Sequence, residues 1–309
     1  MNANKSERLF QVQNKVHPCK LYYDAATNPT ATLLVSCHEQ PGVLNKIANF
    51  IYSNGGNIIH AAQHTDFKAK LLITRIEWQL DGFNLPRGLI APAFQVIAEP
   101  LQPNWQLHFS DPIPRIAIFV SRQDHCLFDL IRRQRNQEFY ADIALIISNH
   151  PELKAVADHF GIDYHYIPIT KENKAAKEAQ KLDLLRHYNI DLVVLAKYMQ
   201  ILTPDFINQF PRIINIHHSF IPAFIGANPY HRAYERGVKF IGTTAHYVTA
   251  DLDAGPIIEQ DVVRVSHRDD VDDLIRKGKD LERVVLARAV RLHLQNRVFV
   301  CGNSTAIFD

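Results

Sequence analysis

The sequence predicts an α/β protein with two domains, a ferredoxin-like β-α-β-β-α-β domain followed by a Rossmann-like, doubly wound parallel sheet. The chain has 309 residues, and a single hydrophobic core rarely grows past about 250–300 residues. Two different rhythms of strands and helices follow each other, separated by the stretch DPIP. We therefore expect a polar arm at 1–30, a first domain at 31–110, a linker at 111–114 and a second domain at 115–309.

The first domain begins with ATLLVSC (31–37), a strand by its apolar and β-branched composition. In PGVLNKIANFIYSNG (41–55), apolar residues recur at helical spacing, Pro41 suits the first turn, and two glycines end the helix. The remaining elements are strands at 57–66, 70–80 and 104–110 and a helix at 86–101, whose start Pro92 obscures. The order is that of the ferredoxin-like unit.

The second domain opens with RIAIFVS (115–121), a nearly continuous apolar strand of the kind that parallel sheets contain. Helices and strands then alternate, which predicts a doubly wound sheet. The expected helices are 125–136, 151–161, 171–189 and 283–296, and the expected strands are 141–149, 163–169, 191–196 and, at an edge, 297–303.

Composition excludes several classes of protein. Hydrophobic residues make up 47% of the chain and charged residues 21%, as in ordinary globular proteins, and the net charge of +2 does not indicate nucleic-acid binding. The N-terminus lacks the apolar region of a signal peptide, and no apolar run reaches the roughly 20 residues of a membrane span. The four cysteines are widely spaced and form no CxxC pair, which favours a reducing, cytoplasmic location.

Polar residues gather where one apolar strand ends, in RIINIHHS (212–219). Side chains alternate along a strand, so Asn215 and His217 should point to one side and His218 to the other. Ligands bind outside the carboxyl ends of parallel strands. Asn215 and His217 therefore form a candidate polar pair at the edge of the sheet where the parallel strands end, which we call the active edge.

A second polar cluster follows in FIGTTAHYVTADLDAGPIIEQDV (240–262). We expect a strand carrying Thr244 and His246, an acidic turn with Asp251 and Asp253, and another strand. A carboxylate on that turn could reach an imidazole of the neighbouring strand. Asn, His and Asp together can perform acyl transfer, because amide and imidazolium stabilise an oxyanion and the carboxylate orients the histidine or accepts a proton.

Other interpretations of these residues remain open. With 16 histidines in the chain, His217 and His246 could be core residues, Asp251 and Asp253 ordinary turn residues, and Asn215 a helix cap. A zinc hydrolase would use His217, His231, His246 and Asp253 as ligands. The sequence contains no HExxH and no short repeated ligand spacing, so we expect no metal.

The segment NIHHSFIPAFIGANPYHRAYERGVKFIGTTAHYVTADLDAGPIIEQDV (215–262) resembles the folate-dependent formyltransferase superfamily. It has that superfamily's Asn-x-His, Ser-x-x-Pro, His-x-Val and Leu-Asp-x-Gly-Pro in matching order. Together with LAKYMQILTP (195–204), it is most similar to the 10-formyltetrahydrofolate deformylase family, whose members carry an N-terminal ACT domain of β-α-β-β-α-β order. The resemblance covers roughly residues 31–305.

The resemblance implies roles for individual residues. Asn215, His217 and Asp253 would be catalytic, with Thr244 and His246 behind Asp253. The pterin pocket would be lined by Tyr198, Met199, Gln200, Ile201, Leu202, Leu252, Ala254 and Gly255. The implied reaction is hydrolysis of 10-formyltetrahydrofolate to formate and tetrahydrofolate, which supplies formate to purine and one-carbon metabolism. Asn215 and protonated His217 would polarise the formyl carbonyl, and Asp253 would accept the proton of the attacking water. Folate is the substrate, and no cofactor is implied.

A formyl group can pass to water or to an amine. Superfamily members that formylate a phosphorylated amine bind phosphate through a glycine-rich loop after their first strand. The corresponding FVSRQDHCLFDL (119–130) has no glycine, and Asp124 adds negative charge, although Asp124 could simply cap the next helix. Water is therefore the expected acceptor. The alternatives are transfer to an unphosphorylated amine and a folate-binding regulator without turnover.

The ACT-like half indicates partners other than folate. ACT domains often pair side by side and bind amino acids at the interface, so we expect a homo-oligomer, a dimer or tetramer, with ACT contacts. In CHEQPGVLNKIANFI (37–51), His38 and Glu39 replace the family's usual Pro-Asp. An amino-acid effector and a purely structural scaffold both remain open. We expect neither nucleic-acid nor membrane partners.

Overall fold

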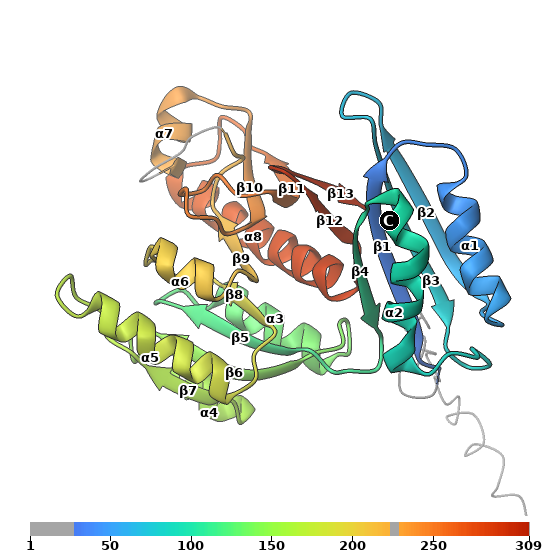
Figure 1. The fold of residues 1–309 in the computed structure, drawn as a ribbon. Coiled ribbons are helices and arrows are strands. Elements are labelled where there is room, and N and C mark those ends of the chain that lie inside the picture. Colours follow the sequence, from blue (N-terminus) through green and yellow to red (C-terminus); the bar gives the residue numbers. More distant parts are fainter. Residues whose placement is uncertain (1–27, 223–228, 309) are drawn as a thin grey trace, which may run out of the picture.

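A computed structural model describes residues 28–222 and 229–308 of the chain. Figure 1 shows two α/β units, one built from the first third of the sequence and one from the rest. The arm expected at 1–30 lies outside the described residues as far as residue 27, and the first strand begins at Thr30. Within the described ranges, no helix is long and apolar enough to cross a membrane.

The N-terminal unit is an antiparallel sheet with order β2-β3-β1-β4. Its strands are β1 (Thr30–His38), β2 (Ile58–Asp66), β3 (Leu71–Gln79) and β4 (Asn104–Phe109). Helices α1 (Val43–Ser53) and α2 (Arg87–Ala98) pack against one face, where they share a core with alternate residues of β1 such as Leu33 and Val35. The β-α-β-β-α-β order is confirmed.

Two local expectations in this unit need correction. Helix α1 begins at Val43, with Gly42 in the left-handed region at φ 83° as its N-cap, so Pro41 precedes the helix. Pro92 lies inside α2, which continues as a short 3₁₀ turn (Glu99–Leu101). Because proline has no backbone N–H, Pro92 removes one hydrogen bond near the start of the helix. Packing of Ile90 and Phe94 into the core stabilises α2.

The second unit is a seven-stranded sheet with order β11-β10-β9-β8-β5-β6-β7. Strands β5 (Arg115–Val120), β6 (Asp142–Ser148), β7 (Asp163–Tyr166), β8 (Leu192–Leu195) and β9 (Ile213–His217) are parallel. Strands β10 (Phe240–Tyr247) and β11 (Ile257–Arg264) are antiparallel to their neighbours. The polar residues of the sequence analysis therefore lie where the parallel block meets an antiparallel strand.

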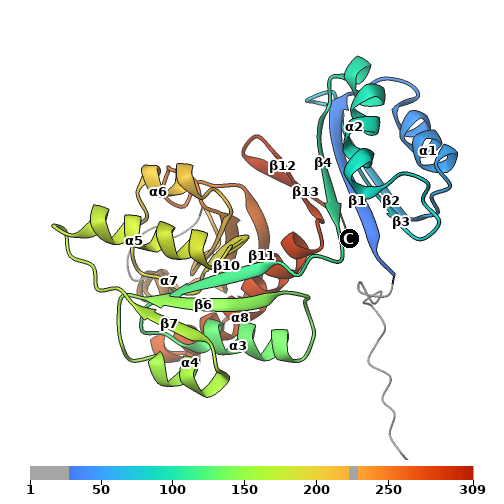
Figure 2. The ribbon, with the colours of Figure 1, turned by 60° about the horizontal axis from the view of Figure 1, so that its bottom comes forward.

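Helices cover both faces of this sheet (Figure 2). Helices α3 (His125–Arg135), α4 (Lys154–Phe160) and α8 (Val271–Leu294) lie on one face, and α5 (Lys174–His187) and α6 (Pro204–Gln209) on the other. Helix α7 (Pro229–Arg236) packs on α8. The sequence analysis did not predict α6, which is only six residues long and begins where Thr203 accepts from the N–H of Phe206.

The C-terminal expectations were wrong in two respects. Helix α8 begins at Val271 rather than at 283, because Asp270 and Asp273 form a capping box there. Residues 297–303 are not an edge strand of the large sheet: β12 (Val298–Cys301) and β13 (Ser304–Ile307) form a separate hairpin. Phe299 and Phe308 of this tail pack with Leu34 and Ile73 on the helix-free face of the first sheet.

Arg75 adds a polar link between the two units. It is 4% exposed on β3 and donates to the backbone oxygens of Asn296 (3.0 Å) and Gln295 (3.2 Å) at the end of α8, while Glu77 neutralises its charge at 2.8 Å. The end of α8 is therefore attached to the first sheet.

Candidate active site

Strand register brings four polar side chains to one face of the sheet. In the β9–β10 ladder, His217 lies opposite Thr244, and Asn215 lies opposite His246. Residues that face each other in an antiparallel pair project to the same side. Ile213 of β9 points to the same side and packs with α5 and α6. The polar group therefore lies on the sheet face that these helices cover, at the carboxyl end of β9.

The turn after β10 carries Asp253 back onto this group. Gly255 allows the close approach: a Cβ there would lie 1.8 Å from the backbone oxygen of Tyr247. Asp253 itself has a φ of 54°, in the left-handed region. Its Oδ1 is 3.2 Å from Nδ1 of His217 and 3.8 Å from Nε2 of His246. Asp253 thus connects His217 and His246, which belong to two different strands.

Hydrogen bonds define the state of His246. Its Nδ1 donates to the backbone oxygen of Tyr247 at 2.9 Å, so Nε2 is the acceptor and receives an N–H of Asn215 at 3.2 Å. Burial lowers the pKa of His246, which keeps the ring neutral. The Asn215 amide is thereby oriented, and its second N–H is left for another acceptor.

His217 and Asp253 form the chemical centre of the group. The hydrogen bond from His217 lowers the pKa of Asp253, against the opposing effect of burial, so Asp253 is a carboxylate in the ordinary pH range. On the other side of the His217 ring, Nε2 is buried and has no hydrogen-bond partner among the described residues, and neither has Oγ of Ser219. An imidazole braced by a carboxylate and open at its far nitrogen can bind a carbonyl oxygen.

Thr244 has a different set of contacts. Its hydroxyl donates to the backbone oxygen of Ser219 (2.9 Å) and accepts from the N–H of Ile221 (3.1 Å) and from Gln260 (2.9 Å). These bonds hold the loop that follows β9. The structure thus places Thr244 opposite His217 in the β9–β10 pair, and these hydrogen bonds do not include Asp253.

Strand alternation predicted that His218 would point to the opposite side from His217, and this prediction was wrong. The two rings are stacked, with centroids 4.8 Å apart and an interplanar angle of 18°. Strand β9 ends at His217, so the alternation stops one residue too early to apply. Burial, reinforced by the charge of Lys197, lowers the pKa of His218 to about 4.

The expected folate-facing segment divides into inward and outward residues. Tyr198 and Leu202 are buried, and the Tyr198 hydroxyl accepts from Lys181 at 2.7 Å. Met199 and Ile201 are exposed by 64% and 61%, and Leu252 by 63%. Gln200 is half-buried, Ala254 is exposed and Gly255 is buried. Outward apolar side chains therefore come from both 198–202 and the Asp253 turn.

The zinc alternative is not assembled by the described residues. His231 is exposed on α7. The group whose ligand atoms lie within 4.8 Å of one another is instead His125, Cys126 and Glu282. The sequence analysis missed this group and Lys197 beside it. Their signal was present, because a lysine in LVVLAKYM and a glutamate in LERVVLARAV interrupt apolar runs.

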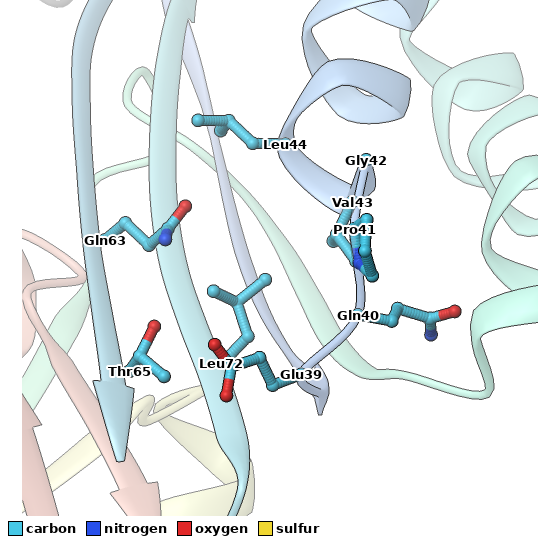
Figure 3. Close-up of a pocket in the computed structure, with 9 residues that line it drawn as sticks. All are labelled: Glu39, Gln40, Pro41, Gly42, Val43, Leu44, Gln63, Thr65 and Leu72. Atoms are coloured by element: carbon cyan, nitrogen blue, oxygen red, sulfur yellow. The ribbon is translucent and has the colours of Figure 1, made fainter. Parts of the chain in front are cut away.

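A separate hollow of about 460 Å³ lies in the N-terminal unit, away from the polar group (Figure 3). The loop after β1 forms one side with Glu39 and Gly42, and Gln63 and Thr65 of β2 form the other. Pro41, Val43, Leu44 and Leu72 also line it, so the hollow offers both polar and apolar contacts.

Comparison with known proteins agrees with this architecture. The family model for formyl transferase matches residues 114–290, and the ACT domain model matches 31–94. The formyltetrahydrofolate deformylase of Synechocystis sp. is 68% identical over 281 residues, which cover 91% of this chain and 99% of that protein. That of Bacillus subtilis is 48% identical over 279 residues, 90% of this chain and 93% of that protein.

A solved structure shares both domains. The crystal structure of a formyltetrahydrofolate deformylase from Pseudomonas syringae pv. tomato is 42% identical, covers 94% of this chain and 97% of its own, and has a TM-score of 0.89. The chain therefore belongs to the formyltetrahydrofolate deformylase family, with an ACT domain ahead of a formyl transferase domain.

Proposed function

We propose that this protein hydrolyses 10-formyltetrahydrofolate to formate and tetrahydrofolate. The observation that carries the proposal is the contact of Asp253 with His217, at 3.2 Å, beside an Asn215 amide oriented by His246. Relatives of 68% and 48% identity that are named formyltetrahydrofolate deformylase support the choice of substrate.

The proposed reaction uses three side chains, Asn215, His217 and Asp253. The formyl oxygen accepts hydrogen bonds from Asn215 and from Nε2–H of protonated His217. Water forms a bond to the formyl carbon, and Asp253 takes one proton from it, directly or through a second water. The oxyanion is stabilised by the same two donors. The C–N10 bond then breaks, Asp253 returns the proton to N10, and formate leaves after losing its remaining proton to solvent.

Folate would be held by the outward-facing residues of two segments. Met199, Ile201 and Leu252 expose apolar side chains that can pack on a planar pterin, and Gln200 with the backbone of 254–255 can supply polar contacts. Tyr198 and Leu202 would support this wall from within the core.

The direct test measures product without an amine. Purified protein is incubated with 10-formyltetrahydrofolate, and formate and tetrahydrofolate are followed together. Catalytic release of both in equal amounts supports the hydrolase. Turnover only when an amine is added would instead indicate a transferase. Tight binding without turnover in either condition would indicate a folate-binding regulator.

We also propose that the hollow of the ACT domain binds an amino-acid effector. Glu39 can pair with an ammonium group, and Gln63 and Thr65 can bind a carboxylate or a polar side chain. Calorimetric titration with the standard amino acids tests this: Gln63→Leu should abolish binding, whereas Gln180→Leu, the same change on the exposed face of α5, should not. Absence of binding by every amino acid leaves a scaffold role.

A homo-oligomer, a dimer or tetramer with ACT contacts, is the third part of the proposal. Tyr52, Phe67 and Val96 of the ACT domain are exposed by 79%, 79% and 71%, as expected of residues that a second copy covers. Light scattering should show a smaller particle for Phe67→Asp than for the unaltered protein. A cytoplasmic location fits the free thiols of Cys37, Cys126 and Cys301.

A further inference from the structure

A buried carboxylate lies beside the candidate active site without being part of the proposed reaction. Glu282, in the middle of α8, is 1% exposed and binds three donors: Nε2 of His125 at 2.6 Å, Nζ of Lys197 at 3.0 Å and the hydroxyl of Tyr230 at 3.1 Å. A buried charge is strongly unfavourable unless it is paired and hydrogen-bonded. Glu282 meets both conditions, so its position is closely determined.

The three donors come from three different segments at the active edge. His125 is the first residue of α3. Lys197 follows β8 and leads into the proposed folate wall, and its φ of 61° is a left-handed conformation that Glu282 helps to hold. Tyr230 lies in the first turn of α7. One carboxylate therefore connects the start of α3, the segment after β8 and the start of α7.

Helix α8 is shaped to accept this arrangement. A Cβ at Gly278 would lie 2.0 Å from the hydroxyl of Tyr230, so the tyrosine crosses the helix where a side chain is missing. Lys197 is only 7% exposed. Its ammonium supplies the cation of the cluster, which opposes a divalent ion at His125, Cys126 and Glu282 by charge repulsion.

The cluster reaches the catalytic histidine through two rings. Tyr230 has its centroid 6.4 Å from that of His218, and His218 stacks on His217 at 4.8 Å. Burial and the Lys197 charge keep His218 neutral, since its pKa is lowered to about 4. His217 thus packs on an uncharged ring, whose place depends on Tyr230 and Glu282.

We propose that Glu282 is a positioning residue for formyl hydrolysis: through His125, Lys197 and Tyr230 it fixes the starts of α3 and α7, the segment after β8 and the His217–His218 stack. This inference rests on the proposed function. It assigns Glu282 no contact with substrate, and it predicts that loss of the carboxylate slows the reaction more than it weakens folate binding.

The test compares two variants. In Glu282→Gln, a side chain of equal size loses its charge and leaves Lys197 unpaired, so we expect kcat to fall about 100-fold, with KM changed less than about threefold. The double variant Lys197→Met/Glu282→Gln no longer buries an unpaired charge and should regain thermal stability. Its kcat should stay low, because no carboxylate connects the segments of His125, Lys197 and Tyr230. Tetrahydrofolate affinity, measured by calorimetry, should persist in both.

Two results would overturn the proposal. One is a wild-type kcat in folded Glu282→Gln, and the other is recovery of kcat together with stability in the double variant, which would reduce Glu282 to a structural role. Glu235→Gln, the same change at an exposed position of α7, is the control and should behave as wild type. If unaltered protein releases no formate, the proposed function fails first. The variants are then compared by tetrahydrofolate affinity and by hydrogen exchange of the first turns of α3 and α7 and of the segment after β8, which Glu282→Gln should accelerate.

Discussion

Asp253 illustrates how single residues acquire reactivity from their surroundings in this protein. Its carboxylate contacts His217 and His246, both buried, and the hydrogen bond from His217 lowers its pKa. An exposed aspartate in an acidic turn would have none of these contacts. The close approach of Gly255 to Tyr247 brings the carboxylate to the histidines.

Asp253→Asn should lower kcat by about 10³-fold or more, because an amide neither accepts a proton from water nor neutralises protonated His217. Tetrahydrofolate binding should remain measurable by calorimetry, since the apolar walls are unchanged. Initial-rate formate assays provide the check, with Asp251→Asn, an exposed neighbour, as the matched control. Turnover of Asp253→Asn like that of the unaltered protein would remove Asp253 from the mechanism.

His218 should make stability depend on pH. Its pKa is lowered from 6.5 to about 4, mainly because the ring is buried. Between these pH values the unfolded chain binds a proton at His218 and the folded chain does not, so a fall in pH favours unfolding. This part of the free energy of unfolding is fully present above about pH 6.5 and is lost as the pH falls to about 4. It amounts to at most about 3 kcal/mol.

His218→Phe keeps a ring in the stack and removes this titration. Urea unfolding of the variant at pH 7 and pH 5 should show a smaller decrease in the free energy of unfolding than the unaltered protein shows. Other buried histidines, such as His246 and His293, also have lowered pKa values, so the informative quantity is the difference between the two proteins. Equal decreases in both would contradict the assignment.

Among the elements, the turn from Asp251 to Pro256 and helix α8 decide where polar groups lie. The turn folds back on β10 with Tyr247 donating to the backbone oxygen of Pro256 at 2.9 Å. Helix α8 carries Glu282 at its middle and reaches the first domain at its end. Each element contains one close approach that only glycine permits, Gly255 in the turn and Gly278 in the helix.

Gly255→Ala should displace the turn, because the added Cβ would lie 1.8 Å from the backbone oxygen of Tyr247. Moving Asp253 by about 1 Å is expected to lower kcat about 100-fold. Gly88→Ala is the matched control: its Cβ would meet no atom within 4 Å, and it lies in α2. Steady-state kinetics distinguish the two, and an unchanged kcat in Gly255→Ala would show that the turn can rearrange without consequence.

For the whole molecule, the connection between domains is the decisive feature. The C-terminal hairpin belongs by sequence to the catalytic domain, yet it lies beside the ACT sheet (Figure 1). Phe299 and Phe308 pack there with Leu34 and Ile73. Arg75 adds hydrogen bonds to the end of α8. The ACT sheet is thus covered on both faces, by its own helices and by this hairpin.

Arg75→Met should loosen this connection by roughly 2–4 kcal/mol, because the backbone oxygens of Gln295 and Asn296 lose this donor and Glu77 loses its cation. Amide hydrogen exchange should accelerate in β12, β13 and the last turn of α8, while β5 and β6 remain protected. Arg276→Met, at an exposed pair with Asp273, should change exchange by no more than about 0.5 kcal/mol. Uniform acceleration over both domains would mean that Arg75 supports overall stability instead.

Local sequence determined the elements whose signals are local. Apolar strands such as 115–120, the helix that Gly161 closes, and the order of both domains follow from periodicity and turn residues. The polar cluster at Asn215 and His217 was also visible, since it interrupts an apolar strand at its carboxyl end. The start of α8 was missed because its first turns, VDDLIRKGKD, are mostly charged and carry little apolar periodicity.

The tertiary structure alone decided contacts between residues distant in the chain. The His217–His218 stack, the bonds of Glu282 to His125, Lys197 and Tyr230 and the docking of the C-terminal hairpin on the ACT sheet depend on strand order and on which surfaces remain uncovered. Periodicity states which face of an element is apolar, but it does not state which partner will cover that face. The sequence by itself therefore determined the two domains and their candidate catalytic residues, and packing decided how the residues meet.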